Sequence, residues 1–218
     1  VDRRTILMSA AATTVTLPIA GHAVADQAAR AKAISRIPGV AQLDQAGSFT
    51  PWMEISRSIL RANLRKIVKA AGGTPVMMVA KANAYGTGET TVPPLVDDMP
   101  EIWGYMVVRP YEALAIASTG VKKPILVMAA VGEDDAIVLA KAGIHLTLTA
   151  KDTPESVRRL AKRLGHPVKI HFEIDTGINR QGMPFRDAAA WATAIYRTGA
   201  VEVQGTASYF IVPPEDRS

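Results

Sequence analysis

Short apolar runs alternate with amphipathic segments along most of the chain. Six apolar runs are predicted to be strands, at residues 76–80, 102–108, 124–128, 144–148, 168–174 and 201–210. Five segments between or before them carry apolar residues at helical spacing, at 59–71, 111–118, 133–142, 154–164 and 186–198. Alternation of strands and helices at this spacing predicts an α/β fold with a parallel sheet and right-handed crossovers.

Three local signals refine this pattern. Residues 52–56 alternate between apolar and polar, which predicts a short strand, and Ser56 is placed to cap the helix that follows. Thr153 is the expected N-cap of the helix over 154–164, and Gly165 its end. A helix through 90–96 is only weakly indicated, because Pro93 and Pro94 interrupt it.

The apolar run 76–80 leads directly into Lys81. A Val- and Met-rich run that follows Pro75 predicts a strand buried on both faces. Lys81 then lies at the carboxyl end of that strand, where parallel α/β proteins place their chemistry. Partial desolvation would favour the neutral, nucleophilic amine. The alternative is a lysine that ends a strand and faces solvent.

The predicted strand at 168–174 runs into a second informative segment. Its apolar and polar residues point to opposite faces: Ile170, Phe172 and Ile174 on one, and Lys169, His171, Glu173 and Asp175 on the other. The apolar face is expected to pack against helices, so the polar face should look inward. Four titratable residues there favour a site over a core, because buried charges need partners. His171 taken alone is more often a satisfied core histidine than a catalytic residue.

Composition narrows the class of protein. The chain has 218 residues, of which 48% are hydrophobic, enough for one domain with a substantial core. It has no cysteine, which excludes disulfides and thiolate metal sites. The net charge is +5, but the basic residues are scattered and only 6% of residues are aromatic. No nucleic-acid partner is therefore expected, since such grooves combine clustered cations with stacking rings.

The N-terminal 25 residues have the features of an export signal. Arg3 and Arg4 precede an apolar run that extends to Ala20, and residues 23–25 form a small-x-small cleavage site. The Arg-Arg-x-Ile-Leu order favours the twin-arginine route. A general secretory signal or an uncleaved anchor are the alternatives. We therefore predict a periplasmic or secreted protein with no stable membrane insertion after cleavage, and a linker over residues 26–50.

The segment Lys81-Ala-Asn-Ala-Tyr-Gly-Thr-Gly88 resembles the cofactor-lysine motif of the alanine racemase family. The segment Asp175-Thr-Gly-Ile-Asn-Arg-Gln-Gly182 resembles a second motif of that family. The resemblance implies a (β/α)₈ barrel that binds pyridoxal 5′-phosphate (PLP), in which Lys81 holds PLP as a Schiff base and acts as one catalytic base. By the same resemblance Tyr85 holds the phosphate and Arg180 donates to the phenolic oxygen of PLP.

Two positions depart from the family pattern. Glu173 stands where many members have a lysine that is sometimes carbamylated, and we hypothesise that it pairs with Arg180. Tyr209 stands where a histidine usually lies against the cofactor ring. A tyrosine can still stack on a pyridine ring, but its neutral hydroxyl is expected to change the local hydrogen bonding and with it the handling of substrate. Together with export, it points to a racemase of broader specificity than alanine alone.

The resemblance covers residues 52–212 but not a whole family member. Two barrel strands, the C-terminal β domain and its opposite-face tyrosine base have no counterpart in this chain. We therefore expect a partial barrel of about six strands, with little racemase activity of its own. The family forms homodimers and acts on small amino acids, interconverting L- and D-alanine. A non-catalytic PLP-binding barrel, or a remnant that binds nothing, are the alternatives.

Overall fold

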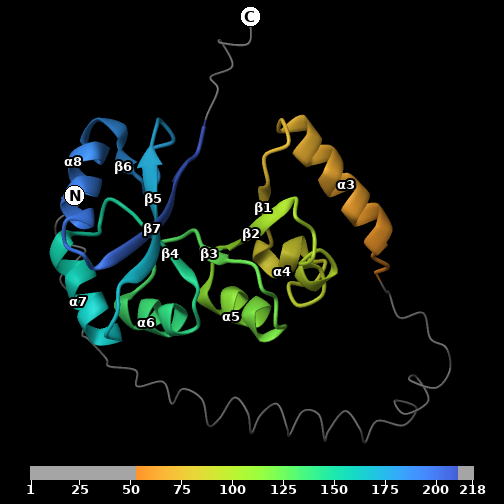
Figure 1. Ribbon diagram of the computed structural model, residues 1–218, viewed down its shortest axis with the longest axis horizontal. Helices are drawn as coiled ribbons and strands as arrows, with labels where there is room; N and C mark the ends of the chain where they lie inside the picture. The colour runs from red at the N-terminus through yellow and green to blue at the C-terminus, as the bar shows by residue number, and fades with distance from the viewer. Residues whose placement is uncertain (1–52, 211–218) are drawn as a thin grey trace, which may run out of the picture. The chain divides into compact units, whose positions relative to one another are not determined.

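The structure is a computed structural model that describes residues 53–210 (Figure 1). The predicted export signal, the linker and Trp52 lie outside the described residues, as does the chain after Phe210. Within residues 53–210, no helix combines the length and apolar character needed to cross a membrane.

The strands form one parallel sheet. Their bounds are β1 Val76–Val79, β2 Ile102–Val107, β3 Ile125–Val127, β4 His145–Leu148, β5 Val168–Asp175, β6 Met183–Pro184 and β7 Val201–Ser208. Neighbours follow the order β1-β2-β3-β4-β5, and β5 also pairs with the two-residue β6 and with β7. All six predicted strands are confirmed, and only β6 was missed. This arrangement is a partial barrel.

Helices cover one face of the sheet, as Figure 1 shows for α5 to α8. The helical segments are α3 Arg57–Ala70, α4 Lys81–Tyr85, the 3-10 turn η1 Pro93–Leu95, α5 Pro110–Ser118, α6 Glu133–Lys141, α7 Pro154–Leu164 and α8 Phe185–Tyr196. The predicted caps are confirmed. The Ser56 hydroxyl accepts from the Ile59 N–H at 3.4 Å, the Thr153 hydroxyl accepts from the Ser156 N–H at 3.2 Å, and Gly165 ends α7 in the left-handed conformation.

Three predictions about local structure were wrong. Residues 53–56 form no strand, and no described strand lies beside them to supply a ladder partner. The weak helix through 90–96 shrinks to the single turn η1, because a proline cannot donate the hydrogen bond that a continuing helix needs. The β1 strand is not buried on both faces, since β2 is its only described neighbour and all four of its residues are partly exposed.

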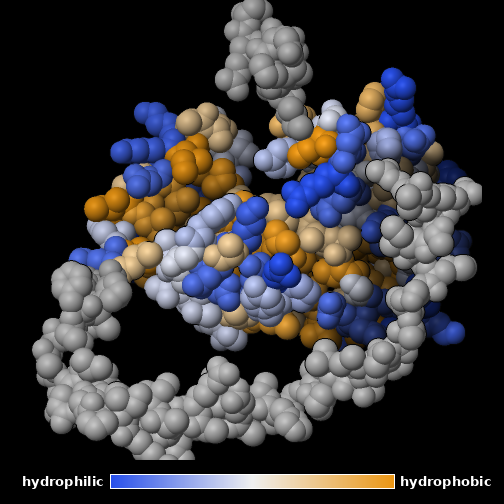
Figure 2. Space-filling model, turned by 180° about the vertical axis from the view of Figure 1, so that it is seen from behind, coloured by the Kyte–Doolittle hydropathy of each residue, from blue (hydrophilic) through white to orange (hydrophobic). Residues whose placement is uncertain are grey.

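The core lies between the sheet and the helices. Its largest fully buried side chains include Tyr105, Leu126, Leu139 and Ile170. Phe172 packs edge-on against Trp191 of α8, with ring centroids 5.0 Å apart, which confirms that the apolar face of β5 points toward the helices. Within the described residues, β1 pairs only with β2 and β7 only with β5, and Val203 on β7 is 40% exposed. Seen from behind, hydrophobic residues accordingly reach the surface among hydrophilic ones (Figure 2).

A histidine pair occupies the opposite face of the central strands. His145 Nδ1 of β4 and His171 Nε2 of β5 are 3.2 Å apart, and both residues are buried. The Trp103 ring stands edge-on to both imidazoles. Burial, together with the smaller effects of the His171 and Lys169 charges, lowers the pKa of His145 to about 4. Burial also lowers the pKa of His171. The pair is therefore neutral at physiological pH.

We expect this pair to make the fold sensitive to acid. Between pH 6.5 and about 4 the unfolded chain binds a proton at His145 that the folded chain does not, so stability falls as pH falls through this window. The loss should be on the order of 2 kcal/mol. Urea unfolding at about pH 7 and about pH 5 measures it. His145→Gln should reduce the change in unfolding free energy between the two pH values. The control His166→Gln, at an exposed histidine, should leave that change as in the wild type. Equal wild-type stability at both pH values would contradict the prediction.

Candidate functional site

Lys81 follows β1 at the carboxyl end of the sheet, as predicted from the apolar run before it. The chain does not continue there as an ordinary helix. Residues 82–85 all have positive φ, between 49° and 56°, and Gly86 follows at 86°. A left-handed non-glycine residue costs roughly 1–2 kcal/mol, so four in succession must be held by their surroundings. This left-handed turn reverses the chain immediately after the lysine.

Arg180 lies on a loop after β5 that is organised by the Asp175 carboxylate. This carboxylate accepts from the backbone N–H groups of Gly177 at 2.8 Å, Asn179 at 3.1 Å and Arg180 at 3.1 Å. The same hydrogen bonds, led by that of Gly177, lower the pKa of Asp175. Gly182 then passes so close to β5 that a Cβ would lie 2.7 Å from the Asp175 nitrogen. The spacing of the second motif thus encodes a compact loop.

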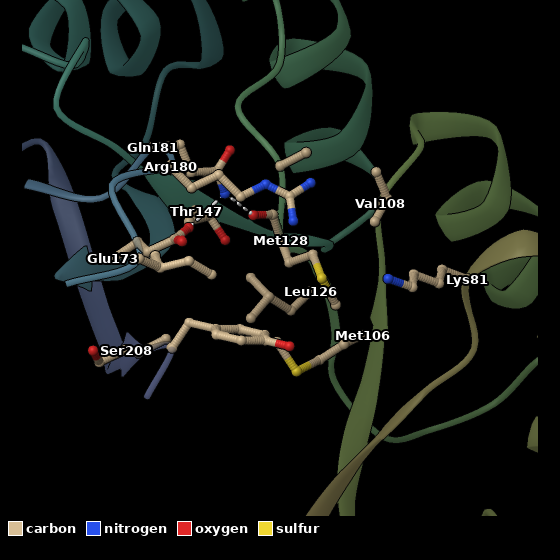
Figure 3. Close-up of a pocket in the computed structure, with 14 residues that line it drawn as sticks. Lys81, Met106, Val108, Leu126, Met128, Thr147, Glu173, Arg180, Gln181 and Ser208 are labelled. Carbon is tan, nitrogen blue, oxygen red and sulfur yellow. Dashed lines mark hydrogen bonds between the residues drawn. The ribbon is translucent and has the colours of Figure 1, made fainter. Parts of the chain in front are cut away.

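The two motifs meet at one cavity of about 190 Å³ (Figure 3). Lys81 reaches toward it from β1, and Arg180 faces it from the loop after β5. One wall is apolar, with Met106, Val108, Leu126 and Met128. The polar lining residues are Thr147, Glu173, Gln181, Ser208 and Tyr209. Residues far apart in the sequence therefore form a single site at the carboxyl ends of the strands.

Among the described residues, the two cations of this cavity have no carboxylate partner. Within residues 53–210, no carboxylate oxygen lies within 4 Å of the charged nitrogens of Lys81 or Arg180. The hypothesised pair of Glu173 and Arg180 is therefore wrong. Glu173 Oε2 instead accepts from the Gln181 side-chain amide at 2.6 Å, and the same amide nitrogen donates to the Met128 carbonyl at 2.7 Å. Gln181 thus binds the Glu173 carboxylate, and no described carboxylate pairs with the Arg180 guanidinium.

The remaining predicted site residues divide into two groups. Tyr209 lines the cavity and is 63% exposed. Tyr85 is 65% exposed and is not among the cavity residues, and His171 is buried beside His145 away from it. The sequence pattern missed Gln181 and Ser208. Gln181 lies within the second motif and Ser208 directly precedes Tyr209, so sequence position was the available signal, but the contacts of both residues depend on the fold.

Comparisons with known proteins agree with this arrangement. The family model described as alanine racemase, N-terminal domain, matches residues 55–217. The chain belongs to the alanine racemase family. The family match contains both the Lys81 segment and the Arg180 segment, and the partial barrel agrees with the fold predicted from the family resemblance.

Individual relatives are similar over the same region. An alanine racemase from Methanococcus maripaludis is 31% identical over 161 residues, which cover 73% of this chain and 43% of that protein. The structure of alanine racemase from D-cycloserine-producing Streptomyces lavendulae matches with a TM-score of 0.65 and 26% identity, covering 74% of this chain and 44% of that one. A histidine racemase from Leuconostoc mesenteroides matches with a TM-score of 0.64 and 25% identity, covering 72% and 42%. The chain thus spans less than half the length of these racemases.

Proposed function

We propose that this chain is the PLP-binding barrel portion of an amino-acid racemase of alanine-racemase type. The observation that carries the proposal is a lysine and an arginine facing one cavity without a carboxylate partner within residues 53–210. Two such cations favour a ligand with negative charge. Membership of the alanine racemase family supports PLP as that ligand.

The residues present fit PLP on chemical grounds. The Lys81 amine is a nucleophile for an aldehyde, and the Arg180 guanidinium is a permanent cation that suits a phenolate or phosphate oxygen. The wall of Met106, Leu126 and neighbouring side chains suits the face of an aromatic ring. The Ser208 and Tyr209 hydroxyls can supply further hydrogen bonds.

The roles of the chain's own residues follow from this fit. Bound PLP would supply an electron sink that makes the hydrogen on the substrate's α-carbon acidic. Lys81 would hold the group in place, and its Nζ would remove or return a proton on its side of the substrate. Arg180 would keep the neighbouring oxygen ionised, since a fixed positive charge favours the anionic form. Glu173, bonded to Gln181, places a carboxylate in the same cavity without neutralising Arg180.

The proposal also covers the class of substrate and the cellular location of the protein. We propose a small amino acid as substrate, with alanine as the first candidate. Tyr209 and the similarity to a histidine racemase support testing larger side chains as well. The arginine pair and small-x-small site at the N-terminus support export to the periplasm. Homodimer formation is proposed from the family resemblance.

Arg180→Gln tests the cation's role. Removing a charge-assisted contact should weaken PLP binding about tenfold or more, because such hydrogen bonds contribute about 1.5–3 kcal/mol. The measurement is a titration of the full chain with PLP, followed by the visible absorbance of lysine-bound PLP. Arg197→Gln is the matched control, since Arg197 is exposed and lies outside the cavity.

The outcomes separate the candidate functions. Saturable binding with formation of the D-amino acid supports the racemase. Binding without racemisation supports a non-catalytic PLP-binding barrel. Absence of saturable binding would overturn both and leave a protein that does not bind PLP. Equal affinity of wild type and Arg180→Gln would remove Arg180 from the site while leaving the rest of the proposal standing.

A further inference from the structure

One buried carboxylate lies behind the proposed cofactor lysine. Glu112 is in the first turn of α5 and is only 2% exposed. Its Oε1 accepts from the backbone N–H of Ala82, the residue that follows Lys81, at 2.7 Å. Its Oε2 accepts from the backbone N–H groups of Val108 at 3.1 Å and Arg109 at 2.9 Å. A single side chain therefore joins the turn after β1 to the loop after β2.

Capping of α5 accounts for only part of this arrangement. A glutamate at the third position of a helix commonly reaches back to the N-cap amide, which explains the bond to Arg109. The bond to Ala82 crosses 30 residues of sequence and caps neither end of α5. It instead fixes the first of four consecutive residues with positive φ. At 2.7 Å it is the shortest of the three bonds and lies in the range of charge-assisted hydrogen bonds.

Ala84 packs in the core, but the other hydrogen bonds of the left-handed turn among the described residues are local. Asn83 Oδ1 accepts from the Glu89 N–H at 3.0 Å, which closes the turn locally. The Ala84 N–H donates to the Ala80 carbonyl at 3.0 Å. Both bonds lie within the same segment and would move with it. Glu112 ties that segment to the neighbouring strand and helix, so it sets where the turn stands relative to the sheet.

We propose that Glu112 is a positioning residue that holds the left-handed turn and thereby fixes the direction in which Lys81 enters the cavity. The part that concerns the cofactor rests on the proposed function, in which Lys81 attaches PLP. The part that concerns the turn does not. Glu112 is not among the residues that line the cavity, so it acts through the backbone at Ala82 and not by contact with a ligand.

Two measurements on the full chain test this role. The first is backbone amide exchange by NMR without added PLP. The Ala82 N–H should be protected from exchange in the wild type. Glu112→Gln should speed amide exchange of residues 82–85 about tenfold or more, because a glutamine side chain has only one oxygen and cannot accept from Ala82 on one side and from Val108 and Arg109 on the other. The second is PLP attachment to Lys81, trapped by borohydride and located by peptide mapping. Glu112→Gln should lower the affinity for attachment about tenfold.

Ser156→Ala is the matched control. Ser156 holds the same third position in α7, where its hydroxyl accepts from the Thr153 N–H at 3.0 Å, but it does not contact the Lys81 turn. This variant should lose a comparable helix cap while exchange at 82–85 and PLP affinity stay within about twofold of wild type. If loss of a helix cap alone were responsible, amide exchange at 82–85 and PLP affinity would change alike in both variants. A positioning role predicts that they change only in Glu112→Gln.

Each outcome decides the proposal. Fast exchange of the Ala82 amide in the wild type overturns it without any variant, which covers the case in which Glu112→Gln does not fold. Unchanged exchange in Glu112→Gln, or faster exchange with unchanged attachment at Lys81, also overturns it. If the wild type attaches no PLP at Lys81, the proposed function fails, and the exchange data alone then decide whether Glu112 holds the turn.

Discussion

Lys81→Ala should abolish covalent attachment of PLP to this chain. The amine of Lys81 is the group that the structure directs into the cavity from the end of β1 (Figure 3). Alanine removes the nucleophile but leaves the Arg180 side and the apolar wall in place. Reversible binding of PLP should therefore persist at reduced affinity, while the visible absorbance of lysine-bound PLP and the borohydride-trapped product at position 81 disappear.

Lys151→Ala provides the control for this experiment. Lys151 also lies in a loop at the carboxyl end of a strand, after β4, but it is exposed and does not line the cavity. Its removal should leave the trapped product at Lys81 unchanged. Trapped PLP on several lysines in similar amounts, or retention of the full signal in Lys81→Ala, would show that the attachment is non-specific.

Gly182→Ala should both lower the free energy of unfolding and displace the loop that carries Arg180. A Cβ at this position would lie 2.7 Å from the Asp175 nitrogen, 2.9 Å from the Ile174 carbonyl carbon and 3.1 Å from the Glu173 oxygen. These are backbone atoms of β5, so no side-chain rotation relieves the contact. We expect a loss of about 3 kcal/mol in the free energy of unfolding.

The same substitution should weaken PLP binding, because the loop that carries Arg180 must move away from β5. Urea unfolding and PLP titration measure the two effects. Gly132→Ala is the matched control, since a Cβ there meets nothing within 4 Å and its φ of −67° suits alanine. Gly182→Ala with wild-type stability and affinity would mean that the loop packs against β5 less closely than the structure describes.

Periodicity in the sequence located the regular elements well. The six main strands and the helices from α5 to α8 were predicted within a few residues, because an apolar run or an amphipathic stripe is a local property. The caps at Ser56, Thr153 and Gly165 were predicted for the same reason. The strand predicted at 52–56 is absent from its described part, residues 53–56, since alternation of residue types does not create the hydrogen-bonding partner that a strand needs.

The left-handed turn after Lys81 could not have been predicted from its residues. Ala82, Asn83, Ala84 and Tyr85 include no glycine, and three of them have no particular preference for positive φ. The turn is held in part by Glu112, which lies 30 residues away in the sequence. Only the packing of α5 against β2 and against the turn that follows Lys81 brings that carboxylate to the Ala82 amide.

The sequence by itself determined the parallel α/β fold, the two motifs and the residues Lys81, Arg180 and Tyr209 as candidates for one site. The tertiary structure decided which of the candidates meet. It brings Lys81 and Arg180 to a common cavity. In the folded chain Glu173 accepts a hydrogen bond from Gln181 and does not pair with Arg180, and His171 lies beside His145. The physical reason is that residue type and spacing fix local conformation, whereas hydrogen-bond partners are chosen among groups that only the folded sheet brings within reach.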